Sequence, residues 1–461
     1  MTASLGQPNV AAVSLEEEAD ELELLTRPGR EEELRTFLRL LDPADVAELI
    51  SEFPAETSKK ILQHLGSERA ADTLSELQPS RQDEVTQLLR PQELAPIVGE
   101  METDDITDLL QEIDPKTAEA VLQALPVEER EEITELLRYE PDTAGGIMQM
   151  ELVSVPVEAT VASALESTRR AAKKIGIISV FVVDEDDRYV GNLALQDLVF
   201  SPAEAKVREV MTPKSVEIFT DLDQEQVAKI FDRYSLVEAG VVDKWGRLRG
   251  RITADDVHEV LVEEADEDVL VMAGAGSEPE VVYSNKIFKI VGVRLPWLLS
   301  TFCAGLAATA VLQDAQHVLG QMVVLLTFVP VITGMSGNVG TQSAMIMIRG
   351  LATGHIDTNA LYKTVAKDLL VGALMALCCA IIVFGVVGVW QRGLFIGACV
   401  AISLFLSMVC AAFLGSVEPP LLKRFGVDPA IAAGPLITSI NDVTGVLIYT
   451  SVVRALMAGV S

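Results

Sequence analysis

The sequence has few of the side chains on which most enzyme active sites and zinc centres depend. Its 461 residues include five cysteines and four histidines. The cysteines show neither a zinc spacing nor a disulfide framework, and all lie in apolar segments, so we interpret them as small core residues. The histidines are scattered and no nucleophile stands beside a base, which makes an enzyme the least favoured class of function. These residues are Cys303, Cys378, Cys379, Cys399, Cys410, His64, His258, His317 and His355.

Two sequence signals are also missing. There is no GxxxxGK[ST] loop, so we expect no ATP-driven motor. Residues 1–24 are polar and acidic and contain no apolar core, so we expect no cleavable signal peptide.

Acidic side chains are nearly missing from the C-terminal part of the chain. Residues 286–461 hold 6 of the 68 Asp and Glu and 10 of the 36 Lys and Arg, a net charge of +4. The formal charge of −32 therefore leaves −36 on the residues before them. Such a charge argues against a nucleic-acid partner, whose phosphates it would repel. Divalent cations would neutralise it, although on the charge count alone a solvated acidic surface is the simpler explanation.

The C-terminal part consists of apolar runs. Five of them are long enough for helices that cross a bilayer, which takes about 20 residues each. They are 293–312, 319–348, 369–390, 394–415 and 430–460. The second contains Pro330 and the glycines Gly334, Gly337 and Gly340, and the fifth contains Gly434 and Pro435. We therefore expect both helices to be broken and to border a cavity.

Basic residues predict the orientation of these spans. Loops on one side carry eight of them, whereas the opposite loops offer Arg392 alone. By the positive-inside rule the acidic part is cytoplasmic, Ser461 lies outside, and the chain is a multi-pass protein of the cell (inner) membrane in contact with lipid. The eight residues are Lys286, Lys289, Arg294, Arg349, Lys363, Lys367, Lys423 and Arg424.

The first half of the cytoplasmic part repeats short amphipathic units. Residues 34–138 contain segments such as DVAELISEF and ITDLLQEI, each ended by Pro or a polar turn. Leu and Ile recur at helical spacing, and prolines stand where helices would start. We expect an all-α superhelical domain over 34–138 and a disordered acidic tail over 1–33.

The second half shows a strand and helix pattern twice. Residues 139–203 and 204–262 each give a β-α-β-β-α order, with an apolar strand that ends in VVD before a hairpin turn. This order resembles a tandem pair of α/β CBS domains, modules that pack as a pseudo-dimer and commonly sense nucleotides or ions. Residues 263–290 then predict a connecting helix, and 291–461 a transmembrane domain of about five helices. The fold class is therefore multidomain.

Asp442 is the most informative single residue. It lies in GPLITSINDVTGVLIYTSVV (434–453), where a carboxylate at the bilayer centre costs at least ~2.5 kcal/mol. Such residues usually face a partner or a watery path, and the basic residues stand at the ends of these spans. We favour an ion pathway over a buried ion pair. Asn338 and Thr341 either line the same path or pack helices together.

Two segments resemble a known family. GMSGNVGTQSAMIMIRGLATG (334–354) and VDPAIAAGPLITSINDVTGVLIY (427–449) are similar to the signature segments of MgtE magnesium transporters, and YEPDTAGGIM (139–148) to the junction before their CBS pair. The order of domains is similar as well, over about 34–458. The resemblance implies a homodimer with one central pore, Mg²⁺ as the transported and the regulatory ion, and a pore closed when cytosolic Mg²⁺ binds the acidic cytoplasmic domains and the connecting helix.

The resemblance also implies metal-binding residues. Asp442 matches the pore aspartate, and Asp428 matches a second metal position unless it only caps a helix before Pro429. The other matches are regulatory acids, each of which is otherwise a solvated surface residue: Asp72, Asp104, Asp108, Asp223, Glu225, Asp256, Glu259, Glu264, Glu267 and Asp268. A carboxylate with retained waters suits Mg²⁺, which dehydrates reluctantly.

The chain departs from the family pattern at several positions. Ser235 replaces an expected aspartate ligand, and Gly240 replaces a proline, which should loosen that strand. Gln196 and Ser179 stand where nucleotide-contacting Arg and Tyr are expected, although Asp197 remains. ATP binding is therefore doubtful.

Passive Mg²⁺ import is the leading functional hypothesis. Alternatives are a broader carrier of Co²⁺, Ni²⁺ or Mn²⁺, a divalent-cation exporter or exchanger, and a membrane-anchored metal sensor without flux. Flux that follows voltage alone would separate import from exchange, and broken spans with Asp442 argue against a sensor alone.

Overall fold

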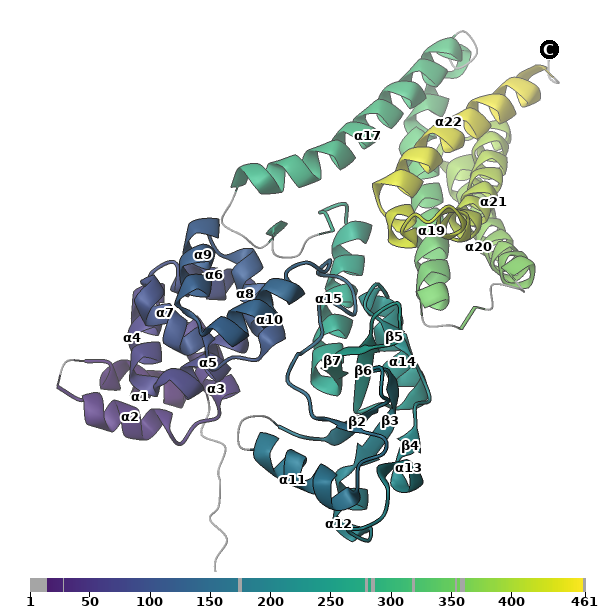
Figure 1. Ribbon diagram of the computed structural model, residues 1–461. Coiled ribbons are helices and arrows are strands. Elements are labelled where there is room, and N and C mark those ends of the chain that lie inside the picture. Colours follow the sequence, from purple (N-terminus) through teal and green to yellow (C-terminus); the bar gives the residue numbers. More distant parts are fainter. Residues whose placement is uncertain are drawn as a thin grey trace, which may run out of the picture. The chain divides into compact units, whose positions relative to one another are not determined.

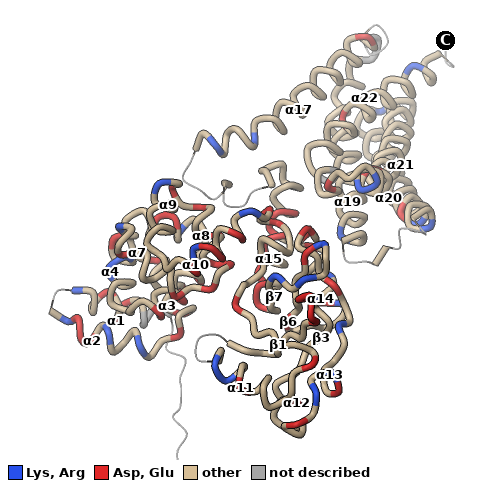
Figure 2. Tube along the Cα trace, viewed as in Figure 1, with Lys and Arg blue, Asp and Glu red and all other residues tan. Residues whose placement is uncertain are grey.

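The chain forms two compact units, residues 1–262 and 263–461. The computed structural model describes residues 15–27, 29–172, 176–277, 281–282, 287–316, 320–352, 355–356 and 361–458. Figure 1 shows helices throughout and strands only in the CBS-like part. Figure 2 shows charged residues spread over the first unit, whereas the second unit carries few.

The N-terminal region is all helical, as predicted. Its core consists of Leu, Ile and Val from successive short helices, including Leu38, Ile61, Leu74 and Leu109. The helices are α1 (Leu15–Leu25), α2 (Glu31–Leu38), α3 (Pro43–Ser51), α4 (Ala55–Leu65), α5 (Ser67–Ser75), α6 (Pro79–Thr86), α7 (Pro91–Val98), α8 (Thr103–Glu112), α9 (Pro115–Ala124) and α10 (Val127–Leu136).

The prediction of a disordered tail over residues 1–33 is wrong for residues 15–25. Residues 15–25 form α1, and Leu22 and Leu25 of that helix are buried in the core of the helical domain. The spacing of the apolar residues explains the error. Leu22 and Leu25 stand three residues apart on one face of a helix, which is enough for a buried stripe once a core lies beside it. Residues 1–14 lie outside the described part.

Proline sets the start of several of these helices. Pro43, Pro79, Pro91 and Pro115 stand in the first turn of α3, α6, α7 and α9. Proline suits this position because its missing N–H would have no partner inside the helix.

Two sheets follow, in the predicted β-α-β-β-α order. In the larger sheet β1 is parallel to β2, β3 is antiparallel to β2, and β4 extends the sheet from the start of the second copy. In the smaller sheet β5, β6 and β7 repeat the first three strands. The elements are β1 (Ser154–Pro156), α11 (Val161–Ala171), β2 (Ser179–Val183), β3 (Tyr189–Ala194), α12 (Leu195–Phe200), α13 (Val207–Val210), β4 (Thr212–Pro213), β5 (Ile218–Phe219), α14 (Gln224–Tyr234), β6 (Glu238–Val242), β7 (Leu248–Thr253) and α15 (Ala254–Met272).

The two copies are tied together by backbone contacts. Gln149 bridges to Arg251 of β7, and Arg188 bridges to Arg247 between the two hairpins. Gly240 does not loosen its strand as expected, because it pairs with Arg251 within β6 and β7. A Cβ there would stand 3.1 Å from the Phe181 ring of the first copy, so the glycine permits close packing between the copies.

The predicted connecting helix begins earlier and ends earlier than expected. α15 runs without interruption from Ala254 at the end of the second CBS copy to Met272, rather than over 263–290. Its carboxyl end is followed by Gly274 with φ +67°. Residues 278–280 and 283–286 of the predicted helix lie outside the described part.

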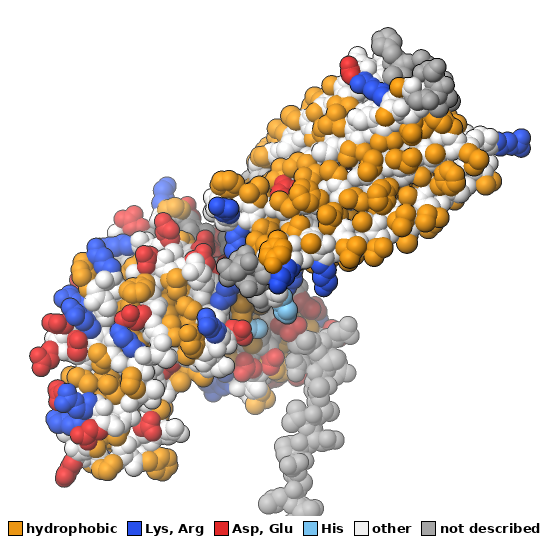
Figure 3. Space-filling view, turned by 90° about the vertical axis from the view of Figure 1, so that its right-hand side faces the viewer, with side chains coloured by type: hydrophobic (Ala, Val, Ile, Leu, Met, Phe, Trp, Pro, Cys, Tyr) orange, Lys and Arg blue, Asp and Glu red, His pale blue; other side chains and the backbone are white. Residues whose placement is uncertain are grey.

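The C-terminal unit contains five helices with the length and composition of membrane spans. They are 287–314, 323–352, 361–390, 394–424 and 435–458. The corresponding elements are α17 (Ile287–Asp314), the 3₁₀ segment η1 (Gly320–Phe328) with α19 (Val329–Ala352), α20 (Leu361–Trp390), α21 (Leu394–Arg424), and the 3₁₀ segment η3 (Pro429–Ala433) with α22 (Pro435–Ala458). Figure 3 shows a surface dominated by hydrophobic side chains over this unit.

One predicted helix break is confirmed and one is displaced. The fifth span is interrupted at Gly434, between η3 and α22. The second span is not broken at its glycines, because α19 is continuous through Gly334, Gly337 and Gly340. Its irregular part is η1, which ends just before Pro330. Of these glycines Gly340 allows a close helix contact, because a Cβ there would stand 2.0 Å from the Asn441 amide, whereas a Cβ at Gly334 or Gly337 would meet open space.

Helices of this unit cross closely at positions where both carry small residues. A Cβ at Gly415 of α21 would stand 2.2 Å from the Gly340 carbonyl of α19, and one at Gly372 of α20 would stand 2.6 Å from Ala412. Small residues allow such approach and increase van der Waals contact between helices in lipid.

Tyr449 joins α22 to the irregular start of the second span. Its hydroxyl donates a hydrogen bond of 2.5 Å to the Leu325 carbonyl, and the residue is 1% exposed. We expect Tyr449→Phe to lower the free energy of unfolding by about 1–3 kcal/mol, because the buried carbonyl loses its partner. Unfolding in detergent measures this, with the exposed Tyr362→Phe as the control. Equal stability of the two variants would contradict it.

Candidate metal centres

An acidic cluster lies in the first unit, where the start of α8 meets the start of α15. Gln149 holds the two together, because its Nε2 donates to Glu102 Oε2 at 2.8 Å and to Asp256 Oδ1 at 3.2 Å. Thr103 adds a second tie, since its hydroxyl donates to Glu151 at 2.7 Å and accepts from the Met150 N–H at 2.8 Å.

Local structure fixes each acid in this cluster. Asp256 accepts hydrogen bonds from the Thr253 N–H at 2.9 Å and the Thr253 hydroxyl at 2.7 Å, which orients its carboxylate at the start of α15. Asp104 lies in the first turn of α8 and is buried, and its Oδ1 has no hydrogen-bond partner among the described residues. A buried carboxylate oxygen without a partner is costly unless something else compensates it.

Burial and mutual repulsion raise the pKa values of these acids. Burial, and then the charge of Asp105, raises the pKa of Glu102 to about 7. Burial raises the pKa of Asp105 to about 6, and the charge of Asp256 adds to that shift. The same causes raise the pKa values of Asp104 and Glu259, and burial raises that of Asp256. Like charges brought together out of water favour protonation or a bound cation.

The cluster supplies the donor set that Mg²⁺ prefers, without forming a finished site. Mg²⁺ binds carboxylate oxygens and keeps several of its waters. Among the described residues no three His, Cys, Asp or Glu side chains are arranged so that they could hold a metal directly. The acids can therefore act on a hydrated ion, or as ligands after a small rearrangement.

The structure brings three of the predicted acids of the first unit together. Asp104, Asp256 and Glu259 belong to the cluster. The pKa of Asp72 on α5 is raised mainly by burial, and the charges that act on it are those of Glu68, Arg69 and Asp42 rather than those of the cluster. The other predicted acids of the first unit are Asp108 on α8, Glu225 on α14 and Asp223 just before α14. Glu264, Glu267 and Asp268 lie on the later part of α15.

Two of these residues have structural roles. Asp223 caps α14, because its side chain accepts from the Gln226 N–H at 3.3 Å. Glu225 pairs with Lys229 at 2.6 Å, a contact between partly exposed side chains. Ser235 ends the same helix in the left-handed conformation with φ +51°. An aspartate or asparagine tolerates this conformation better than serine.

Sequence reasoning missed half of the acidic cluster. Glu102 and Asp105 flank Asp104 in METDD, and Glu151 follows the junction segment. The run of acids at the start of an amphipathic helix was visible, but such acids usually stabilise the helix dipole. Only the fold shows that the junction segment carries Gln149 and Glu151 to the same place.

In the second unit Asp442 lies in the second turn of α22. Its side chain is partly buried, one position after the fully buried Asn441. Asp428 is exposed and caps η3, because its Oδ1 accepts from the Ala430 N–H at 2.8 Å. Asn338 of α19 is exposed and Thr341 is partly buried, so these two polar side chains do not serve internal packing alone.

Two further acids in the spans were missed. Asp368 of α20 accepts a hydrogen bond of 2.5 Å from the Ser416 hydroxyl of α21. Glu418 of α21 has a buried Oε2 without a partner among the described residues. Both stand near the ends of apolar runs, where a charge alone is not unusual.

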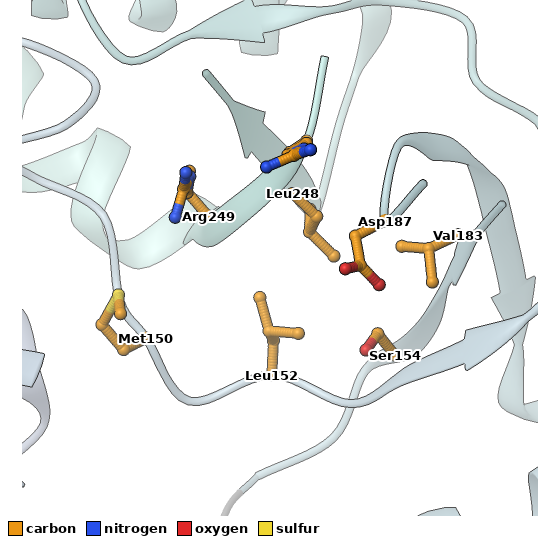
Figure 4. A pocket seen from close by; sticks show the side chains of 8 residues that line it. Met150, Leu152, Ser154, Val183, Asp187, Leu248 and Arg249 are labelled. Carbon is orange, nitrogen blue, oxygen red and sulfur yellow. The ribbon is translucent and has the colours of Figure 1, made fainter. Parts of the chain in front are cut away.

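The pocket between the CBS copies has a different chemistry. It has a volume of about 320 Å³. Leu152 and Leu248 line its middle, Asp187 and Ser154 lie on one side of them, and Arg249 and Met150 lie on the other (Figure 4). Arg249 is held by Asp243 at 2.9 Å. Its arginines make this pocket unsuited to a free cation.

A helical domain, a CBS-like pair and five apolar helices with a carboxylate in the last define a multi-pass membrane protein built for cations. Comparison with known proteins identifies the family. Residues 329–452 match the family model described as a divalent cation transporter, 41–142 match the MgtE intracellular N domain, and 144–204 match a CBS domain.

Curated relatives agree over most of their length. The magnesium transporter MgtE of Thermus thermophilus is 39% identical over 325 residues, which is 70% of this chain and 72% of the relative. The magnesium transporter MgtE of Bacillus subtilis is 30% identical over 435 residues, 94% of this chain and 96% of the relative. The chain belongs to the MgtE magnesium transporter family. It is a multi-pass membrane protein whose N and CBS domains are cytosolic.

Two solved structures share the fold of the first unit. The cytosolic domain of the Mg²⁺ channel MgtE in complex with ATP is 37% identical, with a TM-score of 0.51, and covers 52% of this chain and 99% of its own. The soluble part of a magnesium transporter is 27% identical, with a TM-score of 0.51, and covers 55% of this chain and 100% of its own.

The side chains of this chain fit a nucleotide poorly at Ser179. The Ser179 hydroxyl donates to Glu238 of the second CBS copy. Glu238 also pairs with Arg251 at 3.6 Å, and both are almost fully buried. Gln196 is exposed and carries no charge that could bind a phosphate.

The raised pKa values predict how the cytosolic unit responds to pH. Folding holds protons on Glu102 and Asp105 more tightly than the unfolded chain, so this contribution to stability is complete below about pH 4 and is lost as the pH rises through 6 to 7. Without Mg²⁺, we expect the unfolding temperature of this unit to fall between about pH 5 and about pH 8. Saturating Mg²⁺ should reduce that fall. A profile that is flat without Mg²⁺, or identical in Glu102→Gln, would contradict the assignment.

Proposed function

We propose that this protein is a homodimeric channel or carrier that imports Mg²⁺ and closes when cytosolic Mg²⁺ binds its acidic cytoplasmic part. The observation that carries the proposal is Asp442, an acid in a spanning helix of a chain whose family is defined by magnesium transport. A charged group at membrane depth is retained where an ion passes or binds.

The membrane potential suffices to drive import. Two charges that cross 100 mV release about 4.6 kcal/mol, so no nucleotide hydrolysis is needed. The ion keeps most of its water, and Asp442 and the backbone at the Gly434 break supply oxygen atoms. The C-terminus then lies outside, as the basic loops predict; Ser461 itself is outside the described residues.

A second copy of the chain completes this pathway. α17 has no buried residue in its apolar window, and Asn338 is exposed on α19. Polar side chains on the outside of a span need a polar neighbour or water. Two copies of Asp442 about a two-fold axis give a ring of negative charge, which favours cations. The remaining apolar surface contacts lipid.

Gating follows from repulsion in the acidic cluster. Asp104, Asp256 and Glu259 repel one another until a divalent ion bridges them, so cytosolic Mg²⁺ favours a compact arrangement. α15 starts at this cluster and ends against the last span, because a Cβ at Gly434 would stand 2.8 Å from the Met272 carbonyl. A shift of α15 therefore acts directly on the helix break before Asp442. In this proposal ATP is not required.

Three other functions can be distinguished from Mg²⁺ import by experiment: transport of other divalent cations, export or exchange, and sensing without flux. Co²⁺, Ni²⁺ or Mn²⁺ can share an octahedral oxygen site, and an exporter or exchanger would use the same residues in the opposite direction. A sensor without flux needs no acid within a span.

The pore assignment is tested by flux into proteoliposomes under an imposed voltage. We expect Asp442→Ala to reduce Mg²⁺ flux by at least about tenfold, because the ion loses the carboxylate that offsets its partial dehydration. Asp314→Asn is the control, since that acid is exposed at the end of α17 and pairs with Arg454 in the last turns of α22. Unchanged flux in Asp442→Ala would overturn the assignment, and a requirement for a counter-ion gradient would favour an exchanger.

The sensor assignment is tested by varying Mg²⁺ on the cytoplasmic side. We expect Asp256→Asn to raise the Mg²⁺ concentration that halves the flux by roughly fivefold or more, because the bridging ion loses a carboxylate while the amide oxygen still caps α15. Added ATP should leave that concentration unchanged. Glu166→Gln, at an exposed acid on α11, is the control. A parent protein that ignores cytoplasmic Mg²⁺ would end the feedback model.

A further inference from the structure

Asn441 is buried without a hydrogen-bond partner at the point where three spanning helices meet. The residue is 0% exposed, and neither its Oδ1 nor its Nδ2 has a partner among the described residues. Its amide lies directly over Gly340 of α19, where a Cβ would stand 2.0 Å from Nδ2. Helix α21 closes the third side, because the Ala411 carbonyl is 3.5 Å from the same point.

Two effects on the stability of this crossing act against each other. Small residues, Gly340 and Gly415, let α19 and α21 approach closely, and such contact stabilises helix packing in lipid. The unpaired amide acts against it, because a buried polar group without a partner costs free energy that an apolar group of the same shape would not. Gly340 offers no side chain at this crossing, and the nearby Ala411 carbonyl makes no hydrogen bond with the amide.

Gly445 shows that the contact continues one turn further. A Cβ there would stand 3.2 Å from the Ser336 hydroxyl, and that hydroxyl is already bonded to the Ile332 carbonyl of its own helix at 2.8 Å. The Ser336 hydroxyl of α19 is thus satisfied, whereas the Asn441 amide has no partner among the described residues. The residue that follows Asn441 is Asp442, so a movement at this crossing also moves the carboxylate.

We propose that Asn441 is a positioning residue for ion passage: its unpaired amide makes the tight crossing of α19, α21 and α22 the costlier arrangement, and gains water partners when the crossing loosens. In the loosened arrangement the amide binds water of the hydrated cation at Asp442. This inference rests on the proposed function and adds an element that balances the closing effect of cytosolic Mg²⁺. A few-fold bias between two packed arrangements is enough to shift such an equilibrium.

The test compares Asn441→Leu with the parent and with Ser403→Ala in proteoliposomes. Leucine has the same branching as asparagine and removes the unpaired amide. Ser403 is fully buried too, but its hydroxyl is satisfied by the Cys399 carbonyl of its own helix at 2.7 Å. At low cytoplasmic Mg²⁺ we expect about tenfold lower flux in Asn441→Leu, the effect of one buried unpaired amide, with an unfolding temperature equal to or above that of the parent. Ser403→Ala should match the parent in both measurements.

Each outcome decides the matter. Parent flux that cytoplasmic Mg²⁺ does not inhibit would end the proposed gating, whereas inhibition in the parent with unchanged flux in Asn441→Leu would overturn only the role of Asn441. A lower unfolding temperature of Asn441→Leu would also overturn it, because the amide would then be a packing group. As a second measurement, Asn441→Cys in a background without the five native cysteines should react with a small cationic thiol reagent at low Mg²⁺ and be protected at high Mg²⁺. Equal labelling in both conditions would contradict the loosening.

Discussion

The organising constraint of this protein is that carboxylates leave bulk water without enough positive charge to accompany them. In the cytosolic unit six acids form a cluster with Gln149, whose amide donates to Glu102 and Asp256 but supplies no charge. The nearby guanidinium of Arg251 is already paired with Glu238. In the membrane unit Asp442 stands within an apolar helix. Such groups are stabilised by protons or cations, which is why the proposed function assigns a role to Mg²⁺ in both units.

Patterns of local spacing predicted most of the fold. Leu and Ile at helical spacing with proline at helix starts identified the helices of the N domain, and the repeated strand pattern identified the CBS pair. The apolar runs identified five spans. What failed depended on contacts between distant segments. Residues 15–25 of the acidic tail form α1 because Leu22 and Leu25 are buried in a core, and α19 is not broken at its glycines, of which Gly340 lies at a helix crossing.

The candidate sites were predicted less completely, for a physical reason. An acid at the start of a helix stabilises the helix dipole wherever it lies, so Glu102 and Asp105 carried no distinct signal in the sequence. Their role appears only when the junction segment after Asp142 places Gln149 and Glu151 beside them. Asp442 was recognisable because its surroundings in the sequence are themselves apolar. Asn441 was not, since a single amide in a span is inexpensive unless the fold leaves it without a partner.

In the proposed gating, α15 is the element that links the acidic cluster to the second unit, because this one helix continues across the boundary between the units. α15 has 19 residues, and at 1.5 Å per residue it spans about 28 Å between the Asp256 end and the Met272 end. A helix of this length transmits a displacement because its backbone hydrogen bonds resist bending, whereas a flexible loop would absorb it. Its last carbonyls approach Gly434, the one residue between η3 and α22, and a Cβ there would stand 2.8 Å from the Met272 carbonyl, so the contact depends on this glycine. A larger residue there would separate α15 from the span that carries Asp442. In the proposed gating, repulsion between acids at one end of α15 therefore acts on the last span only while this contact is kept.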